Sequence, residues 1–129
     1  MEHINTSNAP AAIGPYSQGI CFENLIFTSG QIPVDPITGQ IPEGIEAQTH
    51  RSCQNVAAVL NAAGSSMEKV LKTTCFLADM NDFAAFNAVY EQYFISKPAR
   101  SCVAVKALPK GVLCEIEAVA FKEDSYGNS

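Results

Sequence analysis

The fold of this chain is decided by the stretch PARSCVAV, residues 98–105, together with VLCEIEAVAF, residues 112–121. Both stretches are rich in β-branched and small apolar residues, which is typical of strands. Arg100 lies in the first, and Glu115 and Glu117 lie in the second. An arginine cannot lose its charge, so a half-buried strand that carries one must supply an anion. That anion is either one of these two glutamates or the carboxylate of a bound ligand, which a guanidinium pairs with in a forked geometry.

Outward from these strands, the pattern predicts further strands over residues 18–22, 25–29 and 70–78, with a short one near Ile4. A loop rich in proline and glycine occupies residues 31–44. Apolar residues recur every three or four positions from residue 45 to 63 and predict a helix closed by Gly64. Residues 65–68 predict a single helical turn. Residues 79–82 supply caps for a second helix, which ends at Lys97 and Pro98.

This order of elements predicts an α+β domain with a mixed sheet. Its strands are apolar on both sides, with Leu71, Cys75 and Leu77 expected on one face of the third long strand and Val70 and Phe76 on the other. Two helices can cover only one face of such a sheet. We therefore expect a homo-oligomer in which copies of the chain bury the second face.

Composition limits the remaining possibilities. A chain of 129 residues with 47% hydrophobic content supports one core, so we expect a single domain over residues 1–122 and a flexible tail over 123–129. The net charge of -5 and the scattered basic residues disfavour a nucleic-acid binder. The five cysteines form no C-x-x-C pair and are typical of reduced, buried thiols, and the two histidines show no metal-ligand spacing. Without an export signal or an apolar anchor, a cytoplasmic protein is expected.

Five blocks in the same order along nearly the whole chain resemble the RidA/YjgF family of reactive intermediate imine deaminases, also called the L-PSP endoribonuclease family. They are residues 8–18 (NAPAAIGPYSQ), 28–33 (TSGQIP), 81–83 with Asn87 and Tyr90, 98–103 (PARSCV), and 108–110 leading into 115–118 (EIEA). The resemblance implies a chorismate-mutase-like fold of about six strands with two helices on one face. It also implies a homotrimer whose sheets form a central barrel, with a ligand site in each cleft between subunits.

The activity that the resemblance implies is hydrolysis of enamines and imines. The substrate is an intermediate such as 2-aminoacrylate, released by pyridoxal-phosphate dehydratases, and the products are a 2-keto acid and ammonia. This is 2-iminobutanoate/2-iminopropanoate deaminase activity, a form of metabolite damage control, and it implies no cofactor and no metal. The alternative is a trimeric sensor without turnover that binds 2-keto acids or similar small carboxylates. A ribonuclease activity fits poorly with an acidic chain that lacks a basic groove.

The resemblance also implies roles for the two charged strand residues. Arg100 would clamp the substrate carboxylate, and its alternative role is an internal ion pair with Glu115 or Glu117. Glu115 would hold or deprotonate the attacking water and pass a proton to the departing nitrogen, and its alternative role is structural. Because such imines already hydrolyse in water, the enzyme needs to supply only modest help. Glu117 lies two residues further along the same face and is interpreted as structural.

The other predicted substrate-binding residues are Tyr16, Ser29, Gly30, Asn87 and Cys102. Tyr16 would wall the pocket, and Gly30 after Ser29 would let a backbone N–H approach the ligand, although an ordinary buried tyrosine and a plain turn explain the same residues. Asn87 would hydrogen-bond inward or pin a loop. Cys102 has no histidine placed to activate it, so we expect it to line the pocket rather than act as a nucleophile.

Three features depart from the family pattern. The connection over residues 94–98 is shorter than usual, and Ala104 and Ala107 stand where members often carry a glutamate and an arginine. These changes bear on the electrostatics at the rim of the pocket and on the choice of substrate. They leave the matched site residues in place.

Overall fold

The computed structural model describes residues 1–123, and the tail predicted over 123–129 lies outside these residues from position 124 onward. Six strands form one mixed sheet in the order β1-β2-β3-β6-β4-β5. Their bounds are β1 (Glu2–Ile4), β2 (Gly19–Phe22), β3 (Leu25–Thr28), β4 (Val70–Leu77), β5 (Ala99–Ala104) and β6 (Cys114–Phe121). β4 and β5 are parallel, and the other neighbouring strands are antiparallel. The predicted α+β fold class is confirmed.

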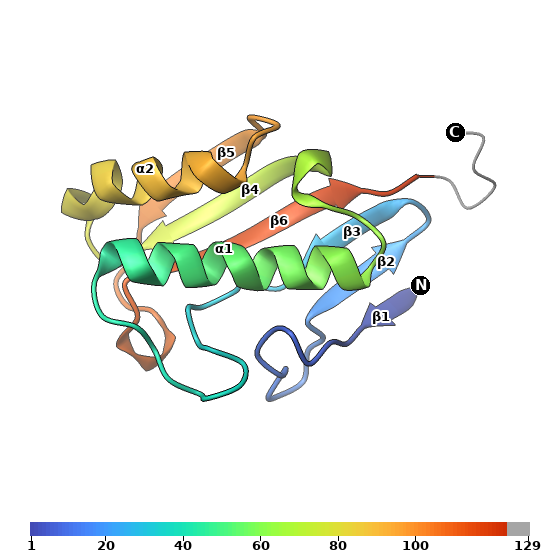
Figure 1. Ribbon diagram of the computed structural model, residues 1–129, viewed down its shortest axis with the longest axis horizontal. Helices are drawn as coiled ribbons and strands as arrows, with labels where there is room; N and C mark the ends of the chain where they lie inside the picture. Colours follow the sequence, from blue (N-terminus) through green and yellow to red (C-terminus); the bar gives the residue numbers. More distant parts are fainter. Residues whose placement is uncertain (124–129) are drawn as a thin grey trace.

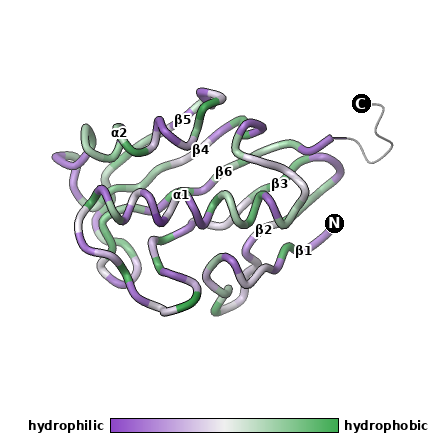
Figure 2. The backbone as a smooth tube through the Cα atoms, viewed as in Figure 1, coloured by the Kyte–Doolittle hydropathy of each residue, from purple (hydrophilic) through white to green (hydrophobic). Residues whose placement is uncertain are grey.

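Two helices, α1 (Ile45–Ala62) and α2 (Phe83–Tyr93), cover the same face of the sheet (Figure 1). Short 3-10 turns precede β4 (η1, Met67–Lys69), precede α2 (η2, Met80–Asp82) and precede β6 (η3, Pro109–Gly111). Along α1, hydrophilic and hydrophobic residues alternate as the helix turns one side toward the sheet (Figure 2). No helix within the described residues is long and apolar enough to cross a membrane.

Local sequence signals account for most element boundaries. The hairpin between β2 and β3 turns at Glu23, whose φ of 56° is in the left-handed region. Gly64, with φ 87°, follows the end of α1 as predicted. Asp79 caps the turn before α2, because its side chain accepts a hydrogen bond from the backbone N–H of Asn81. The second helix ends at Tyr93, earlier than the Lys97–Pro98 boundary that the sequence predicts.

The core lies between the helices and the sheet. Phe86 of α2, Leu60 of α1, Leu77 of β4 and Ile116 of β6 are completely buried there. Full burial of each such side chain stabilises the fold by about 1.5–3 kcal/mol. Residues of β6 alternate strictly between buried and half-buried, so Glu115 and Glu117 point to the face that the helices leave open.

This open face is apolar over much of its area. Its exposed large side chains include Phe22, Phe27, Leu71 and Val103, between 43% and 54% exposed. The sequence assigned Leu71 and Val70 to the wrong faces of β4. A register irregularity between Val70 and Lys72 shifts the alternation by one residue, so Val70 is buried on the helix side and Leu71 lies on the open side.

Candidate active site

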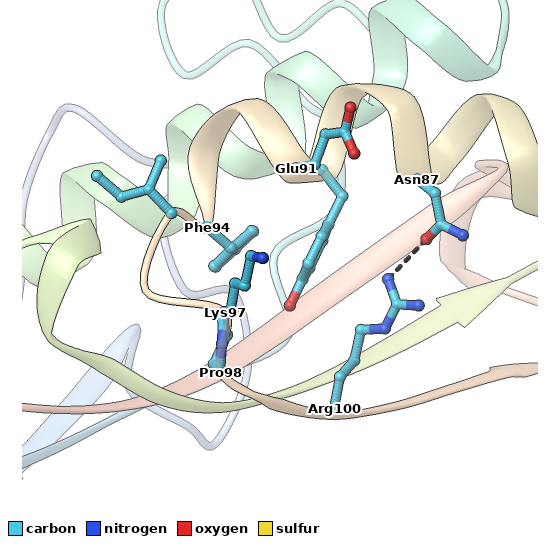
Figure 3. Close-up of a pocket in the computed structure, with 8 residues that line it drawn as sticks. Asn87, Glu91, Phe94, Lys97, Pro98 and Arg100 are labelled. Atoms are coloured by element: carbon cyan, nitrogen blue, oxygen red, sulfur yellow. Dashed lines mark hydrogen bonds between the residues drawn. The ribbon is translucent and has the colours of Figure 1, made fainter.

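Arg100 extends from the edge strand β5 toward helix α2 (Figure 3). Its Nη1 donates a hydrogen bond of 2.7 Å to Oδ1 of Asn87. The guanidinium carbon lies 4.8 Å from the ring centre of Tyr90 and 5.5 Å from that of Phe83. Both distances fall within the range of cation–π attraction. The half-buried guanidinium therefore contacts two aromatic faces and one amide oxygen.

The three contacts come from one side of α2. Phe83, Asn87 and Tyr90 are spaced four and then three residues apart, which places them in a row along a helix. Tyr90 is fixed in turn, because its hydroxyl shares a 2.7 Å hydrogen bond with Thr73 Oγ1 of β4 and its ring stacks on Phe94 at 4.3 Å. Burial raises the pKa of Tyr90 to about 12, so its phenol is neutral at ordinary pH. We call Phe83, Asn87 and Tyr90 the α2 cradle.

No carboxylate of the described residues lies within 4.0 Å of the Arg100 guanidinium. Glu115 and Glu117 are on the open face of the sheet, whereas Arg100 is on the helix face, so the internal ion pair weighed as the alternative does not form within residues 1–123. Beside Arg100 is an open depression of about 570 Å³ between the end of α2 and the start of β5. The guanidinium is thus accessible and has no acidic partner among the described residues.

Glu115 belongs to a second cluster, on the open face. Its half-buried carboxylate lies over Gly30, the residue that follows Ser29 at the end of β3. A Cβ atom at Gly30 would come within 1.9 Å of Glu115 Oε2, so the glycine is needed to make room for this carboxylate. Burial, and secondly the negative charge of Glu117, raises the pKa of Glu115 above its usual value. An upward shift of the pKa is the direction expected of a carboxyl that transfers protons in a reaction.

The loop of Tyr16 is attached to this second cluster. The carbonyl of Ser17 accepts a hydrogen bond from Ser29 Oγ, and the backbone N–H of Ser29 donates to the carbonyl of Gln18 at 2.8 Å. Tyr16 itself is 54% exposed, so it is not the buried tyrosine of the alternative reading. Its hydroxyl accepts a 3.4 Å hydrogen bond from the N–H of Ile13 and remains accessible.

Cys102 lies on β5 on the same face as Arg100 and packs against the core. Burial raises the pKa of its thiol, although the positive charge of Arg100 opposes the shift. A thiol with a raised pKa is a poor nucleophile, which supports the lining role over the nucleophilic one. All five cysteines are free thiols, and the other four are buried, as the sequence predicted.

Sequence reasoning missed two buried amides that hold loops next to the clusters. The side chain of Gln18, 2% exposed, donates to the carbonyls of Thr6, Ala9 and Pro10 and accepts from Thr6 N–H at 2.7 Å. Asn55 of α1, fully buried, donates at 3.0 Å to the carbonyls of Ile32 and Val34. No simple signal marked them, because Gln18 begins a predicted strand and Asn55 lies outside the apolar repeat of the predicted helix.

The predicted site residues therefore form two groups in one chain. Arg100, Asn87 and Cys102 lie on the helix side of β5, and Glu115, Gly30 and Ser29 lie on the open side of β6, with the Tyr16 loop attached. The first group offers a cation, and the second offers a carboxylate with a raised pKa.

A family profile described as "Endoribonuclease L-PSP", which represents the RidA/YjgF proteins, matches residues 6–122. The chain belongs to this family. Among curated relatives, the 2-iminobutanoate/2-iminopropanoate deaminase of Escherichia coli is 53% identical over 123 residues, covering 92% of this chain and 96% of the relative. A RutC family protein of Pyrococcus horikoshii is 56% identical over 124 residues, covering 95% and 98%.

Solved structures agree with this membership. The crystal structure of Escherichia coli TdcF with bound serine superposes with a TM-score of 0.92 at 48% identity, covering 95% of this chain and 100% of that one. The structure of the Escherichia coli YjgF gene product has the same TM-score at 50% identity and the same coverage. Each of these two structures therefore shares the fold over 95% of this chain.

Proposed function

We propose that this protein hydrolyses short 2-imino and 2-enamino acids, such as 2-aminoacrylate and its imine tautomer, to 2-keto acids and ammonia. The observation that carries the proposal is the state of Arg100. It is oriented by the α2 cradle, faces an open depression and has no acidic partner among the described residues. A guanidinium in this state is suited to bind the planar carboxylate of a guest. The names of relatives at 53% identity support the same reaction.

The complete site requires more than one copy of the chain. Arg100 and Glu115 point to opposite faces of the sheet, so one chain alone does not direct both at one small substrate. The apolar open face supports burial against other copies. We propose a homotrimer, in which the first group of one copy, around Arg100, meets the second group of the next copy, around Glu115, in a cleft between the two copies.

In the proposed reaction, Arg100 first fixes the substrate carboxylate, which turns a chance encounter into a defined pose. The Glu115 carboxylate removes a proton from a water molecule as the water oxygen bonds to the imine carbon, and the C=N double bond becomes a single bond. Glu115 then gives a proton to the nitrogen. Glu115 next takes the proton of the new hydroxyl and passes it to the amine, so that the C–N bond breaks as the C=O bond forms and ammonia leaves the keto acid.

The other predicted residues would complete the pocket. The backbone around Ser29 and Gly30 would approach the substrate closely, and Tyr16 would form a wall with an accessible hydroxyl. Cys102 would line the pocket next to Arg100 as a neutral thiol, with its backbone carbonyl orienting water. None of these steps uses a cofactor. The free thiols of all five cysteines support a reducing, cytoplasmic location.

Substitution of Glu115 by Gln tests the reaction against a sensor function. A serine or threonine dehydratase generates the enamine, and the appearance of keto acid is followed with wild type and variant. We expect the variant to lose the acceleration while it still binds 2-ketobutyrate, because the carboxylate is needed for proton transfer and Arg100 remains. If wild type binds 2-ketobutyrate but does not accelerate hydrolysis, the protein is a sensor and the proposed activity is wrong.

A further inference from the structure

We propose that Asn87 is a positioning residue for Arg100, and that its lack of charge is what keeps the arginine available to an anionic substrate. This goes beyond the proposed reaction and rests on it for the role of Arg100. It assigns Asn87 a partner within the chain, in place of the direct contact with substrate that the sequence predicted.

Arg100 lies on β5, at the edge of the sheet, so no strand of the described chain flanks it on its outer side. The contacts that set the direction of its side chain come from α2, and the only hydrogen bond among them is the 2.7 Å bond to Asn87 Oδ1 (Figure 3). That bond uses one of the five N–H groups of the guanidinium. Asn87 therefore fixes one corner of the group and leaves donors for a ligand.

A half-buried arginine is ordinarily matched by a carboxylate. Here every group of the α2 cradle is neutral: Phe83 is a hydrocarbon ring, Tyr90 is a phenol with a pKa of about 12, and Asn87 is an amide. Aromatic faces and an amide oxygen attract a cation, but they do not cancel its charge. The cradle thus stabilises Arg100 without a counter-ion.

Aspartate at position 87 would place a carboxylate oxygen where Asn87 Oδ1 now accepts the hydrogen bond. It would supply Arg100 with an internal counter-ion, and a substrate carboxylate would then have to compete with it. A neutral amide at this position therefore leaves the positive charge of Arg100 to a ligand that carries a carboxylate.

The test is the Asn87→Asp variant, with 2-ketobutyrate as a stable carboxylate probe and titration calorimetry as the readout. We expect the Kd of Asn87→Asp to rise at least about tenfold, which corresponds to 1.4 kcal/mol. Asn87→Ala removes the positioning contact without adding a charge, and its Kd should rise less. Gln92→Glu adds the same charge to an exposed position of α2 and should bind like wild type. Equal losses in the Asp and Ala variants, or a matching loss in Gln92→Glu, would overturn the proposal.

A second measurement needs no ligand, and it separates this proposal from the proposed function. Thermal unfolding is compared for Asn87→Asp and Asn87→Ala, each with Arg100 and with Arg100→Met. We expect the Asp variant to melt above the Ala variant only when Arg100 is present, because the pair then forms inside the chain. A difference that is the same in both backgrounds would refute the Asn87–Arg100 coupling. Absence of imine hydrolysis by wild type would instead refute the function and leave this coupling standing.

Discussion

Substitution of Gly30 by Ala moves the Glu115 carboxylate without altering its charge. The new Cβ atom would lie 1.9 Å from Glu115 Oε2, 2.8 Å from Cδ and 3.1 Å from Cγ. The carboxylate must move by about 1.5 Å to regain ordinary contact. A displacement near 1 Å in an active site costs about 100-fold in rate, or about 2.7 kcal/mol of transition-state stabilisation. We therefore expect kcat/KM to fall about 100-fold, or to the uncatalysed rate if the acceleration by wild type is smaller.

The fold should tolerate this change. Gly30 does not have a positive φ, so alanine meets no backbone strain, and the atoms it would displace are at the flexible end of a side chain. We expect the free energy of unfolding to change by less than about 1 kcal/mol. The assay couples a dehydratase to keto-acid detection, with circular dichroism melting as the control for folding. A second control places Gly30→Ala in the Glu115→Ala background, where it should have no further effect. Full activity of Gly30→Ala, or an effect that adds completely to that of Glu115→Ala, would refute the assignment of Glu115.

Three further results are expected. The enzyme-dependent rate should fall as pH drops through the raised pKa of Glu115. Glu117→Gln should move this fall to lower pH, because it removes the neighbouring negative charge that raises the pKa of Glu115. An unchanged pH profile in this variant would contradict the effect of Glu117 on Glu115. Because the pKa of Glu115 is raised, the folded chain binds this proton more tightly than the unfolded chain does. The contribution of Glu115 to the free energy of unfolding should therefore decline as pH rises from the pKa of the unfolded chain to that of the folded chain. Glu115→Gln should flatten this decline, which denaturant titrations across the acid range would measure. Asn55→Leu should lower the free energy of unfolding by about 1–3 kcal/mol for each of the carbonyls of Ile32 and Val34 that is left without its hydrogen bond. Urea unfolding measures this change, and an unchanged midpoint would show that water replaces the amide.

The sequence predicted the elements well because their signals are local. Gly64 after the first helix, the turn at residues 23–24 and the caps before α2 each act within a few residues. The reversal of Val70 and Leu71 escaped prediction, because the irregularity in β4 arises from its pairing with β6 and not from β4 itself. The early end of α2 likewise leaves a connection over residues 94–98 that no simple stop signal marks.

For the site, the sequence identified the charged residues but not their arrangement. Arg100 and Glu115 are conspicuous because each is charged within an apolar strand, and that anomaly can be read without a structure. Their placement on opposite faces depends on the registers in which β5 and β6 pair with β4, which set Arg100 beside Thr73 and Glu115 beside Phe76, and these registers are long-range properties. The contact between the Glu115 carboxylate and Gly30 was missed for the same reason, because the two residues are far apart in the sequence.

The rate of keto-acid formation with wild type and Arg100→Ala is the most direct test of the central claim, that this guanidinium binds the carboxylate of a substrate. Wild type should accelerate the hydrolysis of dehydratase-generated 2-aminoacrylate, and Arg100→Ala should leave it at the uncatalysed rate, because removal of one partner of such a pair costs on the order of 2 to 5 kcal/mol. Equal acceleration by both folded proteins would show that the carboxylate is held elsewhere and would contradict the account.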